Sequence, residues 1–157
     1  MKSLRYRAVA VVLLLGALTL SAWSPVQAED MTCPPHTPVS IDIKPGSYPN
    51  AINLSAKGVI AVAVLSTPDF FGAQFAPEMA HLADANDDMS QGCPGAVAVR
   101  WVLQDVNGDG AADLVFFFNI RDLDLSASST AATFMAHGSY GGTTLHIMGT
   151  DSVKIVP

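Results

Sequence analysis

Basic residues are scarce in this chain. Its 157 residues include 8 Lys and Arg against 14 Asp and Glu, and the formal net charge is −6. A protein that binds nucleic acid needs a basic patch, so this balance argues against that class of function. An acidic chain is instead suited to holding cations.

Recognisable catalytic motifs are also missing. The four histidines form no H-E-x-x-H or H-x-H spacing, so no local motif supports zinc. There is no G-x-S-x-G nucleophile elbow and no phosphate-binding loop. Glutamate occurs only as Glu29 and Glu78, so a pair of catalytic carboxylates would have to come from aspartates. His137 and His146 could meet across a hairpin, although half-exposed strand histidines are far commoner than metal ligands.

One apolar run stands out, and it is too short to span a membrane. Residues 8–20 are apolar and follow three basic residues, and residues 26–28 read Val-Gln-Ala, a small-residue cleavage site. This pattern predicts a secretory signal peptide over residues 1–28, with retention of the uncleaved segment as the alternative. Cleavage removes three basic residues and no acidic ones, so the formal net charge becomes −9. We expect a secreted or periplasmic protein with no membrane span and, lacking a cysteine at the new terminus, no lipid anchor there.

Cysteine is rare as well, with two residues, Cys33 and Cys93. In an oxidising compartment an even pair predicts one disulfide. Such a bridge would close a loop of about sixty residues and stabilise the fold by roughly 4 kcal/mol in the chain-entropy model. Two free buried thiols are the alternative.

The most informative stretch that is present is the acidic loop over residues 105–113. Side chains that carry oxygen occupy loop positions 1, 3, 5 and 9, and these are Asp105, Asn107, Asp109 and Asp113. Gly110 at position 6 permits a sharp turn, and the carbonyl of Ala111 would fill position 7. This spacing predicts a Ca²⁺ site, since a hard cation takes six to eight oxygen ligands. A plain Asn-Gly or Asp-Gly turn between two strands is the alternative.

The calcium loop departs from an EF-hand. Position 12 is Phe116, where a helical hand needs a bidentate Glu, and an apolar run typical of a buried strand follows the loop. We therefore predict a strand–loop–strand site that Asp113 closes. A second ion site at Asp84, Asn86 and Asp88 is also considered, but Met89 stands where the turning glycine should be, which favours a solvated loop.

The remaining sequence predicts an all-β protein. About seven short strands alternate with turn signals, and helical periodicity is almost absent. We expect a single antiparallel β-sandwich over residues 39–157, preceded by an extended lead-in over residues 29–38; a small barrel is the alternative. The expected strands cover residues 39–44, 58–65, 96–103, 114–118, 130–136, 143–148 and 153–156. Residues 47–55 are expected to form a polar loop and residues 77–82 a short helical turn.

Three segments carry a family resemblance: Ile-Asp-Ile-Lys-Pro-Gly-Ser-Tyr-Pro-Asn-Ala-Ile-Asn at residues 41–53, the loop at 105–115, and Asp-Ser-Val-Lys-Ile-Val-Pro at 151–157. Together they resemble an uncharacterised module of secreted bacterial and archaeal proteins. The resemblance implies a small β-rich extracellular accessory domain, and no catalytic residues carry over. The ion loop is also similar to those of FG-GAP and dockerin-type repeats, which implies calcium ligands at Asp105, Asn107, Asp109 and Asp113.

These observations lead to a functional expectation of a non-catalytic, calcium-binding extracellular domain that attaches to a surface or recognises a protein or glycan. The first alternative is a carbohydrate-binding module that stacks sugars on Tyr48, Trp101 and Tyr140. Trp101 stands at an alternating strand position, however, which is more often a core position. The second alternative is a secreted hydrolase that uses aspartates.

Overall fold

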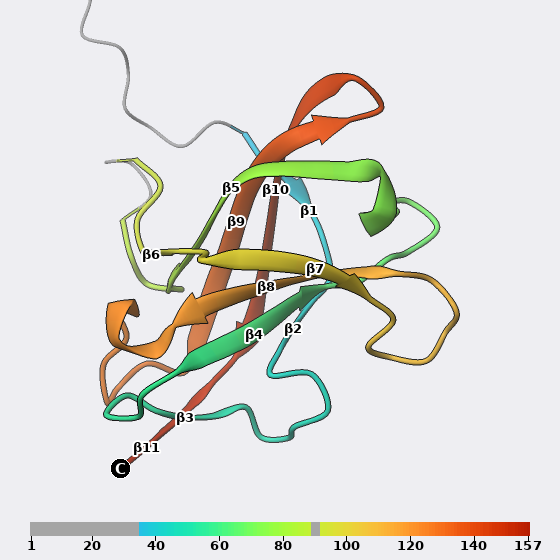
Figure 1. The fold of residues 1–157 in the computed structure, drawn as a ribbon. Coiled ribbons are helices and arrows are strands. Elements are labelled where there is room, and N and C mark those ends of the chain that lie inside the picture. The colour runs from blue at the N-terminus through green and yellow to red at the C-terminus, as the bar shows by residue number, and fades with distance from the viewer. Residues whose placement is uncertain (1–34, 89–91) are drawn as a thin grey trace, which may run out of the picture.

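The protein folds as two packed β-sheets with a short third sheet at one end (Figure 1). The computed structural model describes residues 35–88 and 92–157. The larger sheet has the strand order β1-β10-β9-β5-β6 and the smaller one β2-β4-β8-β7, while β11 pairs with β3. The strands are β1 Thr37–Pro38, β2 Ile41–Ile43, β3 Ala51–Asn53, β4 Val59–Val64, β5 Phe75–Asp84, β6 Ala96–Val97, β7 Arg100–Gln104, β8 Asp113–Asn119, β9 Ala131–Tyr140, β10 Thr143–Ser152 and β11 Lys154–Val156.

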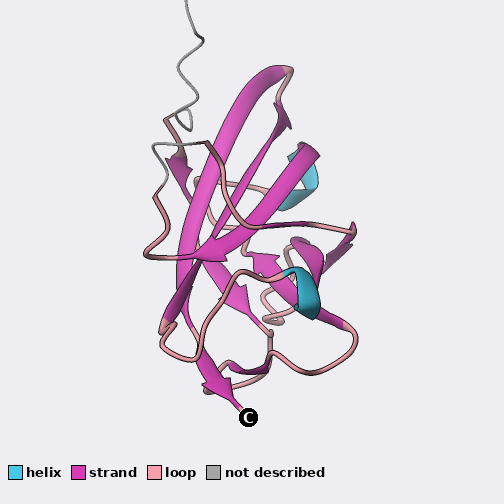
Figure 2. Cartoon of the chain, turned by 90° about the vertical axis from the view of Figure 1, so that its left-hand side faces the viewer, coloured by secondary structure: helices cyan, strands magenta, loops and turns pink. Residues whose placement is uncertain are grey.

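Helical structure within the described residues is confined to two single turns in the connections, η1 Gly72–Gln74 and η3 Ile120–Asp122 (Figure 2). Most strand pairs are antiparallel, as an all-β sandwich predicts. Two short pairs are parallel: β1 beside β10, and β11 beside β3. Both involve segments near the ends of the described chain, which are added to edges of the fold.

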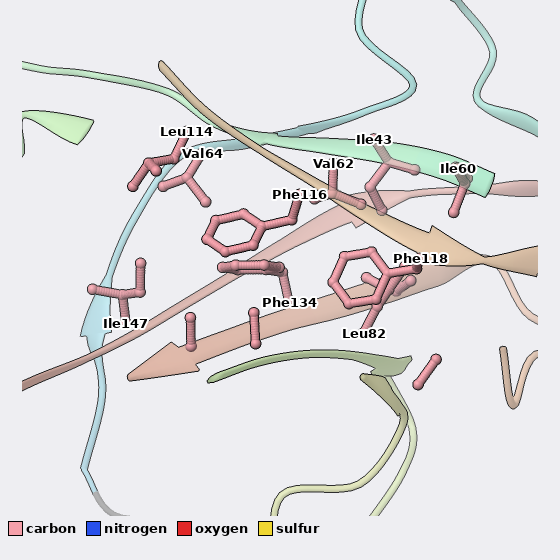
Figure 3. Packing of buried hydrophobic residues seen from close by; sticks show 14 of the residues in the cluster. Ile43, Ile60, Val62, Val64, Leu82, Leu114, Phe116, Phe118, Phe134 and Ile147 are labelled. Carbon is pink, nitrogen blue, oxygen red and sulfur yellow. The ribbon is translucent and has the colours of Figure 1, made fainter. Parts of the chain in front are cut away.

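The core lies between the two large sheets. From the smaller sheet, β8 contributes Phe116 and Phe118, and from the larger sheet β9 contributes Phe134 (Figure 3). The Phe134 ring centroid lies 4.9 Å from that of Phe116 and 6.3 Å from that of Phe118. Aromatic pairs at these separations add to the free energy gained by burying their area. The sandwich prediction is therefore confirmed.

Several local predictions were wrong. Residues 77–82, expected as a helical turn, lie within β5, and the polar loop at 47–55 contains β3. A register shift between Pro77 and Met79 explains the first error, because a bulge breaks the two-residue period that marks a strand. The strand expected over residues 143–148 is longer in the structure, since β10 continues to Ser152.

The predicted signal peptide lies outside the described residues. The lead-in over 29–38 falls mostly outside them too, and its last two residues form β1. No helix in the described part of the chain has the length and apolar character to cross a bilayer.

Candidate ion-binding loop

The candidate loop joins two neighbouring antiparallel strands. β7 ends at Gln104, which is paired with Asp113 at the start of β8, and residues 105–112 connect them. The predicted strand–loop–strand arrangement is therefore present. The paired ends of the strands fix both ends of the loop at the rim of the smaller sheet.

Alternate side chains of the loop turn back onto its own backbone. The Asp105 carboxylate accepts hydrogen bonds from the N–H groups of Gly108 at 2.7 Å and Gly110 at 2.9 Å. The Asn107 Oδ1 accepts from Asp109 N at 3.0 Å, and the Asp109 Oδ1 accepts from Ala111 N at 2.8 Å. Each bond spans two to five residues, so together they wind the loop into a tight curl with oxygens at every second position.

The curl depends on a glycine at position 6. Gly110 has a φ of +88°, in the left-handed region that costs a residue with a Cβ atom about 1–2 kcal/mol. The sequence pattern identified this residue for the same reason.

Asp113 is held differently from the other predicted ligands. Its side chain is fully buried, at 0 % exposure. One carboxylate oxygen accepts a hydrogen bond from Val106 N at 3.0 Å and the other from Ser66 N, just beyond β4, at 2.7 Å. No lysine, arginine or histidine nitrogen of residues 35–88 or 92–157 lies within 4.0 Å of this carboxylate. Asp113 therefore ties the loop to the neighbouring strand through a buried carboxylate that has no basic partner among the described residues.

A second contact holds the loop against the turn that follows β4. The Ser66 hydroxyl donates to the carbonyl oxygen of Ala112 at 2.7 Å and accepts from Gly72 N at 2.9 Å. A Cβ atom at Gly72 would lie 3.1 Å from the Ala112 oxygen, so the chain approaches closely here. Ser66 has no sequence signal for this role, because only the pairing of β4 with β8 brings it to the loop.

The donor types of the loop fit Ca²⁺, but the carboxylates are not gathered around one point. All five predicted ligands offer oxygen, the atom that calcium prefers. Hydrogen bonds from Ala111 N and the Asn107 amide hold the pKa of the exposed Asp109 below its usual value, so its carboxylate is ionised. However, no three acidic, imidazole or thiol side chains of the described residues are arranged to hold a metal ion. Binding would require the loop to tighten around the ion.

The second predicted ion loop is organised around Asp84. Its carboxylate accepts hydrogen bonds from the Ser129 hydroxyl and from both the backbone and side-chain N–H groups of Asn86. These bonds, led by that from Ser129, lower the pKa of Asp84. The Asp84 carboxylate is thus engaged in hydrogen bonds with Asn86 and Ser129. Asp88 also has interactions within the protein. Met89 lies outside the described residues.

The predicted disulfide stays a prediction. Cys33 lies outside the described residues, and Cys93 is not a free thiol.

The two terminal segments of the family resemblance meet in space. Asp151 Oδ2 accepts hydrogen bonds from Ile43 N at 3.0 Å and Asn50 Nδ2 at 2.9 Å. β11, at the other end of the same segment, runs parallel to β3. Asp42 lies beside this junction, where burial and then the negative charge of Asp151 raise its pKa. These motif residues therefore join β10 and β11 to β2 and β3.

The three aromatic residues considered for sugar stacking have different surroundings. Tyr48 is 93 % exposed, whereas the Tyr140 ring stacks on Phe70 with centroids 5.5 Å apart. Trp101 is 44 % exposed, so its expected place in the core is wrong. It is paired with the buried Phe116 and faces the same side of the sheet, but it stands on an edge strand.

Comparison with known proteins adds no relative: no family model, no curated protein and no solved structure matches this chain. The resemblance to the secreted bacterial and archaeal module therefore stays a prediction.

Proposed function

We propose that this protein is a non-catalytic, exported β-sandwich that binds one Ca²⁺ ion at the loop over residues 105–113. The ligands would be Asp105, Asn107, Asp109, the carbonyl oxygen of Ala111, and Asp113. The bound ion would fix the loop, and through it the ends of β7 and β8.

The observation that carries this proposal is the buried carboxylate of Asp113. Buried charges in proteins are generally paired with an opposite charge or bound to a metal, because desolvating an unpaired ion is costly. Asp113 has two N–H partners and no basic neighbour among the described residues. It stands at position 9 of a calcium-type spacing, so a cation at the loop would supply the missing positive charge.

The hydrogen bonds of the loop are compatible with this role. A carboxylate oxygen has two lone pairs, so an oxygen that accepts one N–H group still has an acceptor site for a cation. The bonds from Gly108 and Gly110 to Asp105 therefore orient this carboxylate without using it up. These backbone bonds can therefore be kept while the loop closes around an ion.

A thermal melt with and without calcium tests the proposal. Because the ligands come together only in the folded chain, an ion at 100 times its Kd stabilises the fold by about 2.7 kcal/mol. For a chain of this size we expect Tm to fall by roughly 5–10 °C when a chelator replaces Ca²⁺. Isothermal calorimetry should give one equivalent of Ca²⁺ per chain.

Matched variants locate the ion. Asp109→Ala should abolish the rise in Tm that calcium causes, because it removes a proposed ligand. Asp109 is fully exposed, so the substitution removes no core contact. Asp124→Ala, which removes an exposed aspartate from another loop, should keep the full response. Equal Tm values in calcium and chelator for the unmodified chain would refute the proposal.

A second candidate function, recognition of a glycan, is favoured by the surroundings of Trp101. Its half-exposed side chain lines a hollow of about 340 Å³ between β5 and β7 together with Met79 and Val99. An exposed aromatic face beside a hollow suits stacking on a sugar ring. Binding on a glycan array that Trp101→Ala abolishes would support this candidate, and an array without hits would dismiss it.

A further inference from the structure

Three of the four histidines of this chain lie side by side on adjacent strands. His146 on β10 is the direct antiparallel partner of His137 on β9. His36 immediately precedes β1, whose parallel register pairs Thr37 with Ile147 and so sets His36 beside His146. The sequence separates these residues by up to 110 positions, and the sheet order β1-β10-β9 brings them into one row.

The rings of this row are in contact range. The ring centroids of His36 and His146 are 5.9 Å apart, and those of His137 and His146 are 5.6 Å apart. His146 is therefore the centre of the row, with one imidazole on each side. The His137 side chain is 37 % exposed, so an ion from solvent can reach its ring.

The surroundings of the row add a carboxylate and a thioether. Glu78 Oε2 lies 3.8 Å from His137 Nε2. Met79 is the cross-strand partner of His137 and is 45 % exposed. This separation is too long for a hydrogen bond, so the carboxylate places negative charge near the ring without fixing its orientation. This face thus offers nitrogen ligands, a nearby carboxylate and a soft sulfur atom.

We propose that His36, His137 and His146 together bind one divalent transition-metal ion of the zinc or copper class. Imidazole nitrogen suits these ions, which bind it at about 2.0–2.1 Å for zinc, whereas calcium prefers oxygen. Neighbouring strands are about 4.8 Å apart, so an ion above the central His146 is within reach of a ring from each flanking strand. The site is separate from the 105–113 loop in both its residues and its donor atoms.

The rings must turn to form this site. No three imidazole, acidic or thiol groups of residues 35–88 and 92–157 are already arranged around an ion. The contacts are pairwise, His36 with His146 and His146 with His137. A common centre would require the two outer rings to change their χ1 rotamer or to turn about χ2, a broad torsion in histidine, and their partial exposure leaves room for this.

Calorimetric titration of the chelator-stripped chain with Zn²⁺ alone and with Cu²⁺ alone tests the proposal and distinguishes the two ions. We expect one equivalent of at least one of them with a Kd below about 10 µM, a value near −7 kcal/mol. His146→Ala should weaken that binding at least tenfold, and His36→Ala and His137→Ala should each weaken it too. Asp109→Ala should leave it unchanged, because the calcium loop contributes no ligand.

His81→Ala is the matched control. His81 pairs with Met135 on the same face of the sheet but stands one row away and acts on His137 only through its charge, so its loss should change metal binding much less than the loss of a ligand. His146→Gln provides a second variant of the central residue, and melts of every variant without metal show that each is folded. Absence of binding to both ions, or binding that the folded His146 variants retain at full strength, overturns the proposal.

Discussion

At the scale of single residues, the buried carboxylate of Asp113 has the clearest energetic consequence. Asp113→Ala leaves the N–H groups of Ser66 and Val106 without their acceptor. An unsatisfied buried donor costs about 1–3 kcal/mol, and removal of the carboxylate also removes the cost of burying it without a cation, so we expect a net loss of roughly 1–3 kcal/mol in the free energy of unfolding. Urea unfolding in the presence of chelator measures this loss separately from any contribution of calcium.

The control for this measurement is Asp124→Ala. Asp124 is exposed, and a surface substitution of this kind usually changes the free energy of unfolding by less than about 0.5 kcal/mol. Similar urea midpoints for the two variants would show that Asp113 has no special structural role.

A second prediction at this scale concerns the pH dependence at Asp42. Burial and the nearby Asp151 raise the pKa of Asp42 in the folded chain, so the folded state binds its proton more tightly than the unfolded state does. The ionised group therefore destabilises the fold above its folded pKa, and this penalty disappears as pH falls below the unfolded pKa of about 3.8. Asp42→Asn should raise Tm at pH 7.

The same comparison at low pH checks the cause. The difference in Tm between Asp42→Asn and the unmodified chain should stay constant while the pH is above the folded pKa of Asp42, and it should shrink as the pH falls from there to 3.5. A difference that stays constant over this range would mean that the substitution acts through packing rather than through charge.

At the scale of elements, the bulge in β5 depends on a glycine in the neighbouring strand. Gly138 on β9 faces the irregular step at Pro77, and a Cβ atom placed there would lie only 2.2 Å from the carbonyl oxygen of Ala76. Because the obstacle is backbone, one of the two strands must shift. We expect Gly138→Ala to cost about 1–3 kcal/mol in the free energy of unfolding, as overpacking usually does.

Thr144→Ala serves as the control for this element. Thr144 is an exposed residue of β10 in the same sheet, where a smaller side chain meets no obstacle. If Gly138→Ala unfolds at the same urea concentration as Thr144→Ala, the tight approach of β5 to β9 is not a constraint on the fold.

The strands that the sequence revealed are those with uninterrupted apolar or alternating patterns. β4 and β8 were recognised because both present buried residues almost continuously, as central strands do. β5 was missed because its buried residues do not follow one two-residue period. Phe75 is buried at an odd-numbered position, whereas Ala80 and Leu82, beyond the bulge, are buried at even-numbered positions. β3 was missed because three residues within a polar segment carry no period. Local pattern thus predicts regular strands and fails where neighbouring strands impose irregularity.

At the scale of the whole molecule, the arrangement of strands determines which residues meet, and this information is absent from local sequence. The curl of the candidate loop followed from spacing within nine residues. The contact of Asp113 with Ser66, by contrast, depends on β4 pairing with β8. The row of histidines likewise depends on β1 joining the far edge of β10. The sequence indicates that His137 and His146 can meet across a hairpin, but it does not place Ser66 beside Asp113 or His36 beside His146.

The last prediction concerns the whole chain and the expected bridge between Cys33 and Cys93. A bridge here would restrict about sixty residues of the unfolded chain and stabilise the fold by roughly 4 kcal/mol in the chain-entropy model. We expect a reducing agent to lower the free energy of unfolding by about this amount. A double variant with both cysteines replaced by serine should match the reduced protein and show no response to reductant.

Because β1 is held to β10 by a pair of only two residues, reduction should also expose the amides of Thr37 and Val39 to faster hydrogen exchange. Unchanged exchange at these amides, together with an unchanged urea midpoint, would show that the sheet edge is stable without the bridge.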